Sequence, residues 1–188
     1  MPYNLKDAYK LLCDQLADRN VDVEAVKACL KAQVIETPSW AYADGGTRFK
    51  VFKQAGAAAS IQEKLQDAAE VHKLTGVCPR VAVHVLWDFV DADPLEAKAY
   101  AESLGVKIGA INPTLFEQDE YKLGSACHPC PKVRQKTIQH MLDSVEIGKQ
   151  VGSDFLSLWF ADGTNYPGMD DLLERKHRME EALQTVYK

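Results

Sequence analysis

The chain has 188 residues, a formal net charge of −5 and 46% hydrophobic residues, which is typical of one globular domain. The negative charge argues against a general nucleic-acid or anionic-membrane surface. The sequence contains no run of 18 apolar residues, so we expect no membrane span in it. The N-terminal stretch MPYNLKDAYK lacks the apolar core of a signal peptide, and the five scattered cysteines are an odd number. We therefore expect reduced thiols, a cytoplasmic location, and neither nucleic-acid nor membrane partners.

The first predicted elements are two helices that together cover about residues 4–31. Apolar residues recur at helical spacing over residues 4–18, and Asp22 is suited to cap the second helix. A short strand comes next. It is followed by residues 41–59, which are rich in Gly and Ala and predict a long loop of the kind that is often functional.

A strand followed by a helix is predicted four times between about residues 33 and 188. The four predicted strands cover residues 33–37, 80–87, 106–111 and 155–160. Pro94 and Pro131 are suited to begin helices, and Gly76 and Gly152 to end them. Near-continuous apolar strands that alternate with amphipathic helices predict a parallel sheet, whose ligands bind at the carboxyl ends of the strands.

Aromatic residues stand at several of these predicted strand ends. Trp40 follows the first strand, Phe116 follows the third, and Trp159 lies near the end of the fourth. Aromatic walls with a few polar groups suit a small polar ligand that also has C–H faces, such as a sugar. The alternative is that these rings fill the core, where aromatic residues are frequent.

Two polar residues are further candidates for a ligand site at these strand ends. His84 lies near the end of the second strand, where alternation would place it on one face with Leu86 and Asp88, and Trp87 on the other. A histidine in an apolar strand is also a common hydrogen-bonded core residue. Asp162 could hydrogen-bond ligand hydroxyls, or it could serve the turn chemistry of its Asp-Gly pair.

The segment Cys127-His128-Pro129-Cys130 has CxxC spacing but stands alone in the sequence. A zinc site needs four ligands, and a second pair is not evident. A redox or metal protein built on Cys127 and Cys130 is therefore a weak hypothesis.

Several motifs in order resemble the N-terminal half of the L-rhamnose isomerase family, which belongs to the xylose-isomerase-like (β/α)8 TIM barrels. They are TPSW at 37–40, GGTRF at 45–49, VAVHVLWD at 81–88, YKLGSACHPCPKVRQKTIQH at 121–140 and LWFADGTNYPG at 158–168. The resemblance covers nearly the whole chain. It implies one partial TIM-barrel domain over residues 1–188: N-terminal helices at about 4–31, then the first four βα units at about 33–188.

The resemblance also implies a function, the interconversion of an aldose and a ketose with a divalent metal, typically manganese. His84 matches a histidine that contacts the sugar near its ring oxygen and first carbons. Trp40, Phe116 and Trp159 match aromatic walls of the sugar pocket. Phe49 matches an aromatic residue on a loop that can reach a neighbouring subunit's site. Asp162 lies in a matching motif without an assigned catalytic role.

The family's metal ligands come from later barrel strands, and residues 1–188 contain no segment that resembles them. We therefore expect the complete family enzyme to use Mn²⁺, and residues 1–188 alone to hold no metal. The alternative to a partial isomerase is a non-catalytic half-barrel that binds sugar weakly or assembles with another chain. The open edges of a parallel half-barrel also predict a homo-oligomer.

Overall fold

The computed structural model describes residues 4–44, 53–163 and 170–188, and the chain divides into two compact units, Met1–Val34 and Ile35–Lys188. The first unit contains α1 (Leu5–Ala17) and α2 (Val23–Lys31). Both helices begin where predicted, because the side chain of Asn4 caps α1 and the side chain of Asp22 accepts hydrogen bonds from two N–H groups of α2. In the part of the chain that the structure describes, no helix is long and apolar enough to cross a membrane.

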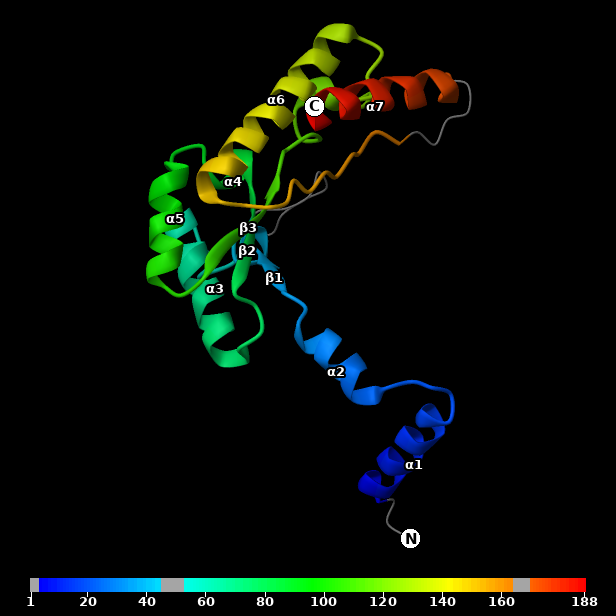
Figure 1. Ribbon diagram of the computed structural model, residues 1–188. Coiled ribbons are helices and arrows are strands. Elements are labelled where there is room, and N and C mark those ends of the chain that lie inside the picture. The colour runs from blue at the N-terminus through cyan, green and yellow to red at the C-terminus, as the bar shows by residue number, and fades with distance from the viewer. Residues whose placement is uncertain (1–3, 45–52, 164–169) are drawn as a thin grey trace. The chain divides into compact units, whose positions relative to one another are not determined.

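The second unit is built on a three-stranded parallel sheet (Figure 1). Its strands β1 (Glu36–Pro38), β2 (Arg80–His84) and β3 (Lys107–Asn112) pair in sequential order. The predicted parallel α/β arrangement is therefore confirmed for three strands. The first strand is shorter than expected and begins later, at Glu36 rather than at residue 33.

The pairing of β2 with β3 contains a bulge. Val81 pairs with Ile108 but Val83 pairs with Ile111, so one residue of β2 faces both Gly109 and Ala110. The N–H of Ala110 donates a 2.9 Å hydrogen bond to the carboxylate of Glu36, which extends from β1. A side chain from the first strand therefore satisfies a backbone group of the third strand.

The fourth predicted strand, at 155–160, is reduced to a single parallel bridge between Ile111 and Leu156. Ile111 donates its N–H to the carbonyl of Phe155 and accepts from the N–H of Ser157. The next residue in position to donate to this neighbour is Pro113, which directly follows β3 and has no N–H. The prediction of a full strand at 155–160 was wrong, because the pairing ends at this proline.

The second predicted strand also ends early. Residues 85–87 were expected to be strand, but Val85–Asp88 form a helical turn, α4. The carboxylate of Asp88 accepts a 2.7 Å hydrogen bond from the N–H of His84, four residues earlier. This bond requires the chain to turn directly after His84, because in an extended strand the side chain of Asp88 would lie too far from the N–H of His84.

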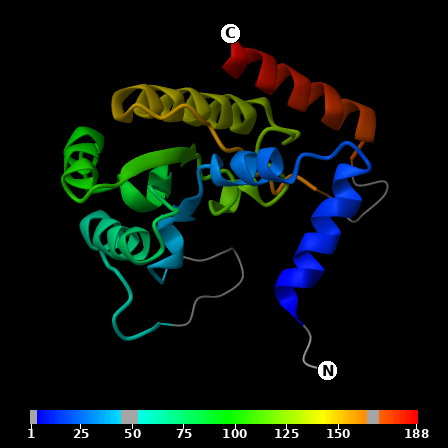
Figure 2. The same cartoon turned by 60° about the horizontal axis from the view of Figure 1, so that its bottom comes forward.

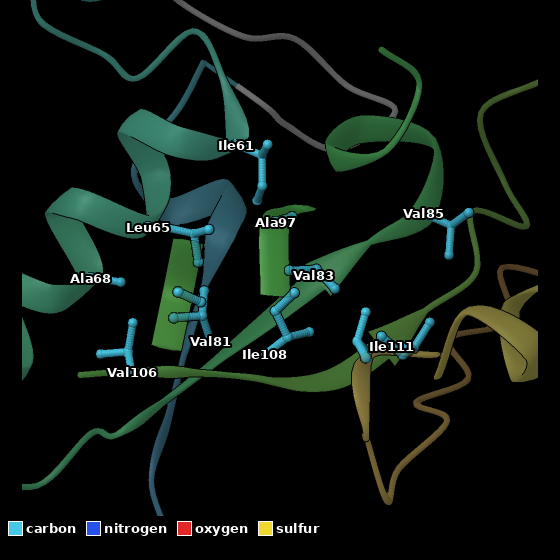
Figure 3. Packing of buried hydrophobic residues seen from close by; sticks show 12 residues of the cluster. Ile61, Leu65, Ala68, Val81, Val83, Val85, Ala97, Val106, Ile108 and Ile111 are labelled. Carbon is cyan, nitrogen blue, oxygen red and sulfur yellow. The ribbon is translucent and has the colours of Figure 1, made fainter. Parts of the chain in front are cut away.

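Three helices follow the strands in the expected order: α3 (Ile61–Thr75), α5 (Pro94–Ser103) and α6 (Pro131–Val151). The main core lies between the sheet and the helices, where Leu65 of α3 points toward Val81 of β2, near Val83 and Ile108 (Figure 3). The last helix, α7 (Leu172–Tyr187), packs beside α6 around Met141 and Ala182 (Figure 2). Two short 3-10 turns, η1 (Ser39–Ala41) and η2 (Asp119–Tyr121), complete the described elements.

Candidate functional site

Five aromatic rings meet beyond the carboxyl ends of the strands. Trp40 lies in η1 directly after β1, His84 is the last residue of β2, and Trp87 lies in α4. Phe116 follows β3, and Trp159 follows the bridge at Leu156. Because the strands are parallel, their carboxyl ends reach the same edge of the sheet, and the residues after them are brought together.

The rings form one continuous series of contacts. His84 lies at its centre, with its ring centroid 4.9 Å from Trp40, 3.9 Å from Trp87 and 6.0 Å from Phe116. Phe116 in turn contacts Trp159, with 4.6 Å between centroids and a near-perpendicular orientation. Edge-to-face contacts of this kind hold aromatic rings in defined orientations. We call these five residues the ring cluster.

The ring cluster is buried at one end and open at the other. His84 and Phe116 are only 7% and 6% exposed, whereas Trp159 is 51% exposed. Of the residues that the sequence suggested as sugar contacts, Trp40 and Phe116 thus lie beside His84, and Trp159 lies beside Phe116. The arrangement offers apolar ring surface beside a polar imidazole.

Burial decides the charge of His84. Desolvation lowers the pKa of His84 to about 4; the nearby His140 and Lys64 act in the same direction, and Asp88 opposes them. The imidazole is therefore neutral at pH 7. Its Nδ1 lies 3.3 Å from the hydroxyl of the buried Thr114. A neutral imidazole has one donor and one acceptor nitrogen, which suits hydrogen bonding to hydroxyl groups.

A second histidine is tied to the same threonine. The backbone N–H of Thr114 donates a 3.1 Å hydrogen bond to Nε2 of His140, so this nitrogen carries no proton. Burial lowers the pKa of His140 as well. Thr114 therefore joins one neutral histidine through its side chain and another through its backbone. His140 lies in a motif that the resemblance quoted, but sequence reasoning assigned it no role.

Asp162 binds the chain itself. Its carboxylate accepts hydrogen bonds of 2.7–2.9 Å from the backbone N–H groups of Ser125 and Cys127 and from the hydroxyl of Ser125. The residue is 5% exposed. Of the two interpretations that the sequence left open, this geometry favours the structural one, in which Asp162 holds the loop that precedes α6.

Trp87 is the ring that sequence reasoning missed. Strand alternation placed it on the face opposite His84, but the helical turn α4 brings residues three apart onto one side. The i, i+3 spacing of His84 and Trp87 was the available signal, but nothing in the apolar run marked where the strand ends. Phe49, another predicted substrate contact, lies outside the described residues.

The CxxC segment does not resemble a reactive site. Cys127 is buried and its thiol lies 3.4 Å from the carbonyl of Arg175, while Cys130 is exposed. Burial, and next the charge of Asp162, raise the pKa of Cys127 above its usual value, which keeps the thiol protonated. Within residues 4–44, 53–163 and 170–188, no three His, Cys, Asp or Glu side chains form a group that could hold a metal ion.

The fold and the ring cluster together define a parallel α/β chain with an aromatic candidate site at the carboxyl ends of its strands. The chain is similar to two proteins that are each named as a probable sugar isomerase. It is 38% identical to one from Rhizobium meliloti strain 1021 over 185 residues, and 33% identical to one from Mesorhizobium japonicum over 189 residues. The alignments cover 95% and 98% of this chain but only 43% and 44% of those relatives. The chain thus spans less than half the length of the relatives it matches.

Solved structures show the same fold. The crystal structure of 3-keto-D-glucoside 4-epimerase, YcjR, from E. coli matches 82% of this chain and 51% of its own length, with a TM-score of 0.51 and 14% sequence identity. At that identity the likeness concerns the fold alone. No protein-family model matches the chain.

Proposed function

We propose that this chain forms the substrate-binding part of a sugar isomerase that interconverts an aldose and a ketose. The observation that carries the proposal is the ring cluster, in which four aromatic side chains and a neutral imidazole meet at the carboxyl ends of parallel strands. Aromatic faces pack against the C–H surfaces of a sugar, and the imidazole hydrogen-bonds its hydroxyls. The names of the two relatives support this class of substrate.

The finer form of the proposal follows the family resemblance. The chain then supplies the first four βα units of a (β/α)8 barrel, the substrate is of the L-rhamnose type, and the complete enzyme is a cytoplasmic homo-oligomer that uses Mn²⁺. Within the described residues, no three His, Cys, Asp or Glu side chains form a group that could hold a metal ion, so we propose that the metal ligands of the complete enzyme lie outside those residues and assign no metal-dependent step to this chain. Relatives more than twice as long leave room for such ligands.

Intrinsic fluorescence tests the proposal directly. The chain has three tryptophans, and all of them, Trp40, Trp87 and Trp159, belong to the ring cluster. Titration with L-rhamnose and other monosaccharides should give a saturable change in emission. His84→Asn should weaken it, whereas Tyr187→Ala, which alters a 94% exposed aromatic residue outside the cluster, should not. An emission spectrum that no monosaccharide changes, even at concentrations well above the typical KM range of roughly 1 μM to 1 mM, would refute the proposal.

A specific observation favours a second candidate, a non-catalytic half-barrel that assembles with another chain. Phe155 and Trp159 lie near the sheet edge formed by the bridge at Leu156, and they are 60% and 51% exposed. Exposed aromatic residues beside an unpaired edge favour association. Light scattering distinguishes the two candidates when it is combined with the sugar titration. A stable oligomer that binds no sugar would support the second.

A further inference from the structure

We propose that the buried ion pair between Lys64 and Asp88 positions the ring cluster. Lys64 lies on α3 and Asp88 ends α4, and neither carries a ring of the cluster. The expected change in sugar affinity rests on the proposed function. The expected change in the orientation of the rings does not.

The carboxylate of Asp88 is fully used. One oxygen accepts a 2.6 Å hydrogen bond from Nζ of Lys64. The other accepts from the hydroxyl of Ser39 at 2.6 Å and from the N–H of His84 at 2.7 Å. The side chains of Lys64 and Asp88 are 7% and 0% exposed, so water does not compete for these bonds.

Each group that the pair binds lies at or beside a ring. Ser39 directly precedes Trp40, and His84 is itself at the centre of the cluster. Nζ of Lys64 also lies 3.5 Å from the carbonyl of Trp87. The ion pair therefore contacts the chain at three of the five rings. Asp88 binds the backbone of His84 and the residue before Trp40, and Lys64 contacts the backbone of Trp87.

The pair is better explained by positioning than by stability. Removing two charges from water costs several kcal/mol per ion, and buried pairs can often be replaced by apolar residues without loss of stability. What apolar residues cannot supply is direction, since hydrogen bonds fix both distance and angle. The hydrogen bonds of this pair join the ends of β1 and β2 to α3, and so fix the spacing of Trp40, His84 and Trp87.

The test compares two single variants, Lys64→Met and Asp88→Asn, with the control variant Lys73→Met. Lys73 is a matched control because it lies on the same helix and pairs with Glu70 at 2.9 Å on the surface. In Asp88→Asn, the amide must turn its N–H₂ group either toward Lys64 or toward the donors of Ser39 and His84, so not all donors remain satisfied. Far-UV circular dichroism reports folding. Near-UV circular dichroism reports the Trp40–Trp87 pair, whose centroids are 6.2 Å apart.

We expect both single variants to keep their far-UV spectrum, to change their near-UV spectrum, and to bind the sugar about tenfold more weakly. Lys64→Arg should restore part of both properties, because it keeps the charge and the donors. Lys73→Met should match the wild type throughout. If Lys64→Met does not fold, Ser39→Ala offers a milder change that keeps the ion pair and removes one bond.

An unchanged near-UV spectrum in folded Lys64→Met and in Ser39→Ala would overturn the positioning role. If the wild type binds no monosaccharide, the proposed function fails, but the near-UV comparison still decides whether the pair positions the rings. If the near-UV spectrum changes while sugar affinity stays that of the wild type, the orientation of these rings does not govern binding. The link between the pair and the sugar site is then wrong.

Discussion

The imidazole of His84 and the indole of Trp87 lie with their ring centroids 3.9 Å apart and their planes at 38°. The two residues are three apart in the chain, and the helical turn α4 brings them to the same side. Nε1 of Trp87 also donates a 2.8 Å hydrogen bond to Glu117, which follows Phe116. Trp87 therefore connects the end of β2 to the loop after β3.

If the ring cluster binds sugar as proposed, removing this indole should weaken the binding. For Trp87→Ala we expect a Kd for the monosaccharide roughly tenfold higher, about 1.4 kcal/mol, in the range of single aromatic contacts. Trp87→Phe should recover most of the affinity, because it keeps a ring and loses only the bond to Glu117. Calorimetric titration measures both values. Equal affinities for the alanine variant and the wild type would remove Trp87 from the sugar site.

The protonation of His84 should be unusual. Proton NMR of the ring should give a pKa of about 4, well below the ordinary value of 6.5, because burial disfavours the charged form. The other groups that influence it are Asp88, Lys64 and His140. His84→Asn identifies the resonance among the five histidines. A measured pKa near 6.5 would show that the ring is open to water.

The same shift should make stability depend on pH. The folded pKa of His84 lies below the unfolded value, so the unfolded chain binds the proton more readily between pH 6.5 and about 4. The contribution of neutral His84 is complete above pH 6.5 and decreases as the pH falls toward 4. The free energy of unfolding of the wild type, measured with denaturant, should therefore decrease as the pH falls from 6.5 to about 4. His84→Asn should reduce this pH dependence of the free energy of unfolding, and the contribution of His140 should remain.

Asp162 should prove structural. Asp162→Asn replaces one acceptor oxygen by a donor that faces the N–H groups of Ser125 and Cys127. We expect a loss of about 1–3 kcal/mol in the free energy of unfolding, the usual cost of leaving buried groups unsatisfied. Asp154→Asn is the control, because the side chain of Asp154 is 73% exposed. A fall in sugar affinity without a fall in stability would instead make Asp162 a substrate contact.

Two buried glycines should respond oppositely to alanine. A Cβ at Gly109 would lie 2.7 Å from Oε2 of Glu36, whose carboxylate must then leave the N–H of Ala110. We expect Gly109→Ala to cost about 1–3 kcal/mol. A Cβ at Gly148, inside α6, would meet Ile111 at 3.5 Å, an ordinary contact. Gly148→Ala should therefore stabilise the chain by about 0.5–1 kcal/mol. Thermal unfolding of both variants checks the pair, and a neutral Gly109→Ala would show that Glu36 moves at no cost.

The sequence by itself determined the order and type of most elements, because these depend on local signals. Asp22 and Asp93 cap helices, Pro94 and Pro131 begin them, and Gly152 ends one in the left-handed conformation. Periodicity predicted the three parallel strands. It also placed Trp40, His84, Phe116 and Trp159 at strand ends, where parallel pairing brings them together.

Only the tertiary structure decided where two strands stop and which polar residues serve the fold. The apolar run at 80–87 carries no mark of the turn after His84, because that turn depends on a carboxylate at Asp88 that also binds Ser39 and Lys64 from distant parts of the chain. Asp162 has the local appearance of a ligand or turn residue, and its role depends on Ser125, 37 residues away. Local patterns encode dihedral preferences and burial, whereas the partners of a buried charge are set by contacts that form only when the chain folds.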